Sequence, residues 1–93
     1  MEVRIVKTEG IVGGKARIDG TRIRVIDIVE DYEILRNTIE EIAESYGITV
    51  VQVLEALKYY YENPEAIREE IKSEKRAFDK FKKEGNVLTI QHA

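Results

Sequence analysis

Few residues in this chain have the chemistry of a catalytic or metal-binding site. The 93 residues contain no cysteine, and the single histidine, His92, lies at the C-terminal end. A cysteine nucleophile, a histidine-based catalytic pair and a histidine or thiolate metal cluster are therefore excluded. Glu40, Glu41 and Glu44 lie close together in sequence, but acidic residues at a helix start are usually solvated and favour the helix dipole.

A glycine-rich run, GIVGGK at 10–15, resembles a phosphate-binding loop only in part. It is one residue too short, and it lacks the following serine or threonine that holds magnesium. We therefore predict that the protein is not an enzyme and has no metal site and no cofactor.

The middle of the chain predicts two helices joined by a short turn. Thr38 and Glu41 have the spacing of a capping box, in which the threonine caps the helix and the glutamate reaches back to the cap's backbone N–H. Thr49 and Gln52 repeat this arrangement, and Gly47 supplies the left-handed end of the first helix. Two helices connected in this way form a helix-turn-helix, which is typical of DNA-binding proteins.

The second helix of this motif, 50–62, has an apolar face and a mixed face. The predicted core seam consists of Val50, Val53, Leu54, Leu57 and Tyr61. The opposite face carries Gln52, Glu55, Ala56 and Tyr59, and we expect it to face DNA, with Gln52 as a candidate reader of adenine. The predicted DNA-binding residues are Thr49, Gln52, Lys58, Arg36, Arg22 and Arg24. For the last two the alternative is packing against the acidic helix that follows them.

The charge distribution does not favour DNA binding by this motif. Residues 30–63 hold two basic and eight acidic residues, a net charge of −6, whereas 1–29 carry +2 and 64–93 carry +1. A DNA-binding surface normally has a basic footprint. The two ends of the chain would therefore have to supply much of the phosphate contact.

The N-terminal third predicts β structure. A short strand runs from Val3 to about Lys7, and the Asp19-Gly20 pair between two β-prone runs predicts a hairpin. Because a two-stranded ribbon is only marginally stable, the first strand either completes a small sheet or pairs with a second subunit, and we predict a homodimer. The first helix should begin near Val25, with Val25, Ile28, Val29 and Tyr32 on its buried face.

The last third, 64–93, predicts a charged helix from Pro64 to about Lys83, followed by a short strand over 87–90. Few apolar residues lie on this helix, so the chain offers no partner for the aromatic residues at its far end or for the lone strand. We therefore expect this end to dock on another protein. The predicted partner-binding residues are Phe78, Phe81, Lys80, Lys82, Lys83, Val87, Leu88 and Ile90. We expect Ile67 and Ile71 to pack on the core instead. The chain thus divides into a core unit, 1–63, and a partner-binding tail, 64–93.

No apolar run approaches the roughly 20 residues that a membrane span needs, and the N-terminus lacks a signal-peptide pattern. We expect a cytoplasmic protein without a membrane partner.

Two stretches, GGKARIDGTRIRVIDIV and TIEEIAESYGITVVQVLEALKYYYENP, resemble the family known as domain of unknown function 433. The shared pattern is a glycine pair, I-x-GTRI-x-V, and EEIAE-x-Y before a helix rich in Val, Leu, Ala and Tyr. Ala16 and Arg24 stand where the family commonly has proline. The resemblance implies a mainly α protein with a small N-terminal β arm and a homeodomain-like three-helix core. It also implies an antitoxin-like role, since such genes commonly lie beside one for a PIN-like nuclease toxin.

One leading hypothesis and two alternatives follow for the function. The first is an antitoxin-like protein that binds a cognate nuclease toxin through its tail and binds operator DNA as a dimer. The second is a stand-alone helix-turn-helix regulator. The third is a dimeric adaptor that does not bind DNA, which the acidic middle segment favours.

Overall fold

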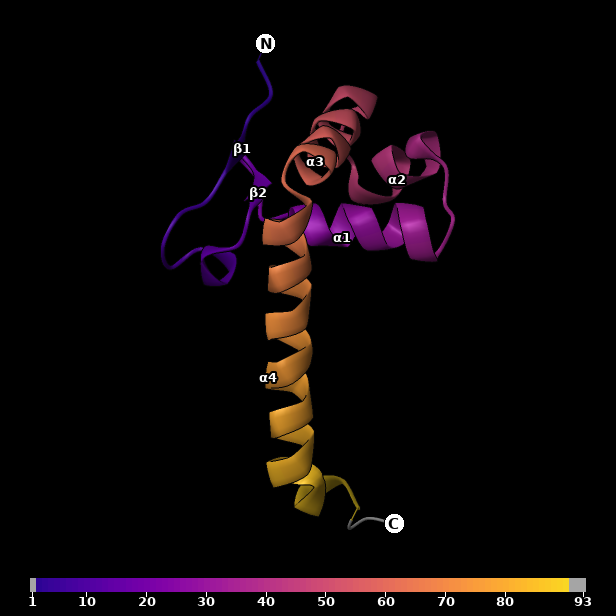
Figure 1. The fold of residues 1–93 in the computed structure, drawn as a ribbon. Helices are drawn as coiled ribbons and strands as arrows, with labels where there is room; N and C mark the ends of the chain where they lie inside the picture. The colour runs from indigo at the N-terminus through magenta and orange to yellow at the C-terminus, as the bar shows by residue number, and fades with distance from the viewer. Residues whose placement is uncertain (1, 91–93) are drawn as a thin grey trace.

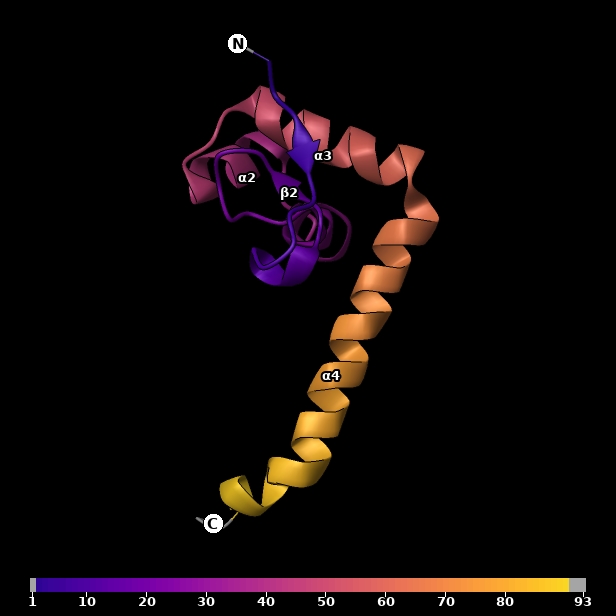
Figure 2. The same ribbon diagram turned by 90° about the vertical axis from the view of Figure 1, so that its left-hand side faces the viewer.

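A small helical body and one long projecting helix make up the structure, a computed structural model that describes residues 2–90 (Figures 1 and 2). The mainly α fold with a small N-terminal β arm confirms the predicted fold class. The elements in chain order are β1 (Ile5–Val6), the 3-10 turn η1 (Val12–Gly14), β2 (Arg17–Ile18), α1 (Val25–Val29), the π-helical segment η2 (Glu30–Ile34), α2 (Ile39–Tyr46), α3 (Val50–Glu62) and α4 (Pro64–Ile90).

The β arm closes on itself within the chain. β1 and β2 are antiparallel, with Ile5 opposite Ile18. The predicted turn at Asp19-Gly20 is confirmed, because the Thr21 N–H donates to the Ile18 carbonyl at 3.0 Å. Gly20 has φ of +84°, a left-handed angle that favours glycine there. The first strand was expected either to complete a small sheet or to pair with a second subunit. Its pairing with β2 shows the first of these.

The first helix begins at Val25, as predicted, and continues without a break into η2. The helix is wider in η2 than in α1, because its hydrogen bonds join residues five apart. The Leu35 N–H, for example, donates to the Glu30 carbonyl at 3.0 Å. Val25 and Ile28 are fully buried, whereas Leu35 is 63% exposed at the end of the segment.

The predicted helix-turn-helix and both capping boxes are confirmed. The Thr38 and Thr49 hydroxyls accept from the N–H groups of Glu41 and Gln52 at 3.0 and 3.1 Å, and each partner side chain accepts from the cap's N–H at 2.8 Å. Gly47, with φ of 69°, ends α2 in the left-handed conformation.

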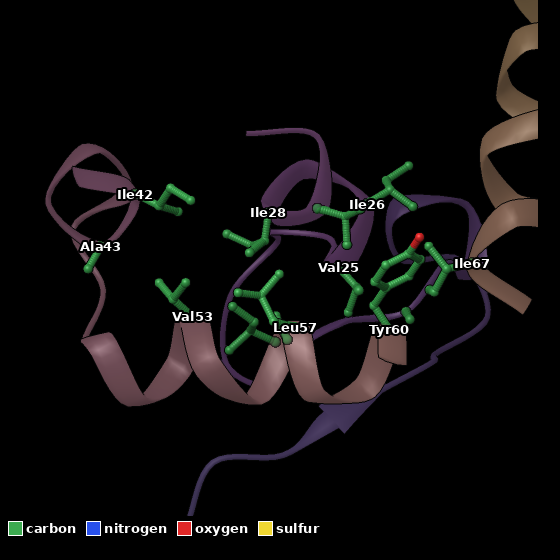
Figure 3. Packing of buried hydrophobic residues seen from close by; sticks show 13 residues of the cluster. Val25, Ile26, Ile28, Ile42, Ala43, Val53, Leu57, Tyr60 and Ile67 are labelled. Carbon is green, nitrogen blue, oxygen red and sulfur yellow. The ribbon is translucent and has the colours of Figure 1, made fainter. Parts of the chain in front are cut away.

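The core lies between α1, α2, α3 and the base of α4 (Figure 3). The predicted seam of α3 is partly wrong: Val53 and Leu57 are buried, but Val50, Leu54 and Tyr61 are 39%, 46% and 58% exposed. The buried face is rotated toward Ala56 and Tyr60. The residues of α3 that are buried in the structure are Val53, Ala56, Leu57 and Tyr60.

The C-terminal helix is longer than predicted. α4 starts at Pro64 and runs to Ile90, so the predicted strand at 87–90 is wrong and these residues form the last turn of the helix. A lone β-prone run has no neighbouring strand to satisfy its backbone groups, whereas continuing the helix satisfies them within the segment. Within residues 2–90, no helix has both the length and the apolar character to cross a membrane.

Candidate partner-binding surfaces

The face of α3 that was expected to meet DNA is partly covered by the N-terminal strand. Arg4 and Ile5 line one hollow together with Glu55 and Tyr59 of α3. Figure 3 shows the strand on the side of α3 opposite the core residues. A DNA duplex that approached the C-terminal half of this face would meet β1 before it met Tyr59.

The polar residues at the start of α3 serve the helix cap. The Gln52 side-chain oxygen accepts from the Thr49 N–H at 2.8 Å and lies 3.3 Å from the Thr49 hydroxyl. A bidentate contact with adenine needs this same oxygen as well as the amide nitrogen. Reading adenine would therefore compete with the capping box that starts the helix.

The predicted basic residues lie on separate segments of the chain. Arg22 and Arg36 lie in loops and Lys58 lies on α3, and all three are exposed. Arg36 has φ of 61°, an uncommon angle for a residue other than glycine, and it lies in the turn after η2. Lys58 lines the hollow beside β1, together with Glu55 and the C-terminal end of α3.

Arg24 joins the helical body to α4. Its guanidinium pairs with Asp27 at 2.7 Å and also with Glu74 of α4. The hydrogen bond to Asp27 is the largest of the effects that raise the pKa of Arg24. Burial raises the pKa of the neighbouring Glu30, and the charges of Asp27 and Glu74 add to this effect. The alternative expectation for Arg24, packing on the acidic helix that follows, is confirmed.

The base of α4 is also held by Glu70. Its carboxylate accepts from the Ala16 N–H at 3.1 Å and lies 3.9 Å from the Lys7 ammonium, and only 11% of the side chain is exposed. Ile67 is fully buried and Ile71 is half-buried against the core. The first three turns of α4, from Pro64 to Glu74, therefore belong to the folded body.

Beyond Glu74 the helix leaves the body, and we call residues 75–83 the arm (Figure 2). Phe78 and Phe81 are 61% and 63% exposed on it. The arm also carries five cations and one carboxylate, Asp79. Lys75 lies 3.7 Å from Asp79, and Arg76 pairs with Glu69 at 2.9 Å. The predicted contact residues Lys80, Lys82 and Lys83 are all exposed on the arm. Val87, Leu88 and Ile90 belong to the following turns of α4, for which the structure describes the backbone only.

The exposed aromatic residues continue the face by which α4 docks. Ile67, Ile71, Glu74, Phe78 and Phe81 follow one another at alternating spacings of four and three residues. This spacing places them along a single stripe of a helix. Ile67 is fully buried and Ile71 half-buried against the body, and Glu74, 41% exposed, pairs with Arg24 of the body, whereas the two phenylalanines make no such contact with it. The exposed phenylalanines therefore extend the docking stripe of α4 past its own domain.

A second exposed apolar surface was not expected from the sequence. Val50, Val51, Leu54 and Tyr61 lie exposed along α3, and we call them the α3 stripe. The Tyr61 hydroxyl donates to the Glu33 carboxylate at 2.7 Å, and this bond is the main cause that raises the pKa of Tyr61 to about 12. The sequence does show these apolar residues at helical spacing, but we interpreted that spacing as the buried face of α3.

The glycine-rich run does not present free backbone donors at its last two positions. The Gly14 N–H donates to the Ile11 carbonyl at 2.8 Å, and the Lys15 N–H donates to the Val12 carbonyl at 3.3 Å. A phosphate loop needs such N–H groups for its ligand. In the part of the chain that the structure describes, no three His, Cys, Asp or Glu side chains are arranged to hold a metal ion.

Comparison with known proteins agrees with this architecture. A crystal structure of a DUF433 member protein from Anabaena variabilis ATCC 29413, at 2.00 Å resolution, matches with a TM-score of 0.64 and 40% sequence identity. The match covers 72% of this chain and 66% of that protein, so the chain spans just under two thirds of the length of that relative. No curated protein matches. The family described as "Protein of unknown function (DUF433)" matches residues 5–60, and the chain belongs to this family.

Proposed function

We propose that the protein is an antitoxin-like adaptor that captures a nuclease toxin with the arm of α4. The observation that carries the proposal is the exposure of Phe78 and Phe81, 61% and 63%, on a helix that has left its own domain. Aromatic side chains in this setting are typical anchors of protein–protein interfaces. The role is exerted in the cytoplasm, where the toxin is made.

The charge of the arm supports a nuclease as the partner. The arm carries five cations beside the two phenylalanines in sequence and a single acidic residue, Asp79. The cations are Lys75, Arg76, Lys80, Lys82 and Lys83. Nucleases that use magnesium concentrate carboxylates at their active site. A cationic helix with aromatic anchors complements such a surface in charge, and this favours both rapid association and specificity.

The test is inhibition of the nuclease encoded by the neighbouring gene. Wild-type protein should block its cleavage of RNA, and the variants Phe78→Ala and Phe81→Ala should each weaken the block about thirtyfold, the loss expected for a hot-spot residue of about 2 kcal/mol. Ile34→Ala is the matched control, since Ile34 is equally apolar and 70% exposed but lies on η2. Unchanged inhibition by both phenylalanine variants would refute the proposal.

DNA binding by α2 and α3 is the second candidate function. The confirmed helix-turn-helix favours it, and Arg22, Arg36 and Lys58 are exposed to make phosphate contacts. Fluorescence anisotropy with DNA from upstream of the gene, at low salt, tests it. Lys58→Ala should weaken binding to all sequences alike, whereas Gln52→Ala should relax sequence preference. Absence of binding at low salt would leave the adaptor that does not bind DNA.

A homodimer formed through the β arm stays a prediction. β1 uses one edge to pair with β2 of the same chain, so a second copy would have to add to the other edge. With only two residues in β1, that edge offers few backbone hydrogen bonds.

A further inference from the structure

A single residue, Asn63, joins α3 to α4. It has φ of −133° and ψ of 53°, so it belongs to neither helix. Its N–H and its side-chain amide both donate to the Tyr59 carbonyl, at 2.8 and 3.0 Å, and its own carbonyl accepts from the Ile67 N–H at 3.2 Å. Rotation about the Cα–C bond of Asn63 changes the direction of α4 without breaking any of these three hydrogen bonds. Residues at the ends of elements commonly act as hinges in this way.

The apolar contacts of α4 with the body lie close to this joint. Ile67 is fully buried and Ile71 is half-buried, and Ile71 lies about 12 Å along the helix from Asn63, at 1.5 Å per residue. The next apolar residues on the same face, Phe78 and Phe81, are exposed. Contacts so near a joint resist a turn of a long helix weakly, because they act at a short distance from it.

The ion pair between Glu74 and Arg24 lies farther from the joint. Glu74 is about 17 Å along the helix from Asn63. Among the hydrogen bonds and ion pairs of residues 2–90, this one holds α4 to the body at the greatest distance from Asn63. It therefore opposes rotation of α4 more effectively than the contacts at the base of the helix do.

Arg24 is held in place to receive Glu74. Its Nε and one terminal nitrogen donate to the two oxygens of Asp27, at 3.2 and 2.7 Å, and its other terminal nitrogen donates to Glu74. A guanidinium that is fixed by a two-pronged contact has little freedom left to lose when it binds a second carboxylate. Asp27 lies in the first turn of α1, so the pair connects α4 to a rigid part of the body.

We infer that α4 is a lever hinged at Asn63 and locked by the Arg24–Glu74 ion pair, which makes Arg24 and Glu74 positioning residues for the arm. With the lock closed, Phe78 and Phe81 point in one direction. With it open, the arm takes many directions, and a partner has to order it on binding, which weakens the complex. This last consequence rests on the proposed function, whereas the hinge and the lock do not.

Double electron–electron resonance on the purified chain tests the lock. The chain has no cysteine, so spin labels attach only at the substitutions Ser45→Cys on α2 and Lys80→Cys on the arm. Dilution with unlabelled protein restricts the measurement to distances within one chain. Lys80 lies about 24 Å along the helix from Pro64, so a turn of about 20° at the joint moves its label by about 8 Å.

The chain with Arg24 and Glu74 intact should give one narrow distance distribution. Glu74→Ala and Arg24→Ala should each broaden it by at least about 8 Å. Circular dichroism melts should show that both variants are folded, and Glu74→Ala is the safer of the two because Arg24 also contacts α1. The nuclease is absent from this experiment, so its outcome is separate from that of the inhibition assay.

Glu69→Ala is the matched control. Glu69 pairs with Arg76 at 2.9 Å, but both residues lie on α4, so this change removes an ion pair without freeing the joint. It should leave the distance distribution unchanged. A broad distribution with the lock intact would overturn the inference, and so would a narrow one in either lock variant, because Ile67 and Ile71 would then be enough to fix α4. Equal broadening by Glu69→Ala would also overturn it, since the arm would then bend within itself.

Discussion

Replacing Ile67 by alanine tests the division of α4 into a docked base and a projecting arm. Ile67 is fully buried on the docked side. Removing three buried carbons costs about 2.4 kcal/mol at about 0.8 kcal/mol each, and the cavity left behind adds to this loss. We therefore expect the free energy of unfolding to fall by about 3 kcal/mol, a large fraction of the about 5–15 kcal/mol that stabilises a typical domain.

Phe81→Ala is the matched comparison on the same stripe of the same helix. Phe81 is larger than Ile67 but 63% exposed, so its loss should change the free energy of unfolding by less than about 0.5 kcal/mol. Urea unfolding followed by far-ultraviolet circular dichroism measures both values, at protein concentrations low enough to keep the chain monomeric. Equal losses for the two variants would refute the reasoning, because the base of α4 would then be no more part of the core than its arm.

Three further predictions concern single side chains of the body. Thr49→Ala should lower the free energy of unfolding by about 0.5–2 kcal/mol in urea melts through loss of the helix cap, and Thr49→Ser should not. The hydrogen bond to Glu33 raises the pKa of Tyr61 to about 12, so the stability that it contributes is complete below pH 10 and is lost as the pH rises from 10 toward 12. Ultraviolet titration should show one tyrosine of Glu33→Gln ionising at lower pH than in wild type, and an unchanged titration would contradict the assigned bond. The pKa of Glu30 is raised mainly by burial, so its carboxylate lowers stability once it is ionised. Glu30→Gln should raise the thermal midpoint at neutral pH, with the gain disappearing below the ordinary pKa of 4.5, and a lower midpoint at neutral pH would contradict this.

The parts of the fold that the sequence predicted correctly depend on local signals. The two capping boxes, the left-handed Gly47 and the Asp19-Gly20 turn involve residues within a few positions of one another. Such interactions depend only on residues that are close together in sequence, so the types of neighbouring residues are enough to identify them.

The errors arose where distant segments decide the outcome. α3 has apolar residues around much of its circumference, and periodicity alone could not show that α1 would cover the side of Ala56 and Tyr60 and leave Val50, Leu54 and Tyr61 exposed. The β-prone run at 87–90 became helix because no strand lies beside it to pair with.

The candidate site was predicted in part. The exposure of Phe78 and Phe81 follows from their place in a charged helix with few apolar neighbours. The role of Arg24 could not be assigned in the same way, since its partner Glu74 lies fifty positions away in sequence. A contact of this separation depends on how α4 crosses the start of α1, which no local pattern records.

Hydrogen exchange with and without the proposed nuclease partner tests most directly the central claim that the arm of α4 is the partner-binding element. The account predicts that residues 75–83 gain protection when the nuclease binds, whereas Pro64 to Glu74 are protected in the free protein as well. Gained protection confined to α2 and the start of α3, with the arm still exchanging freely, would contradict the account.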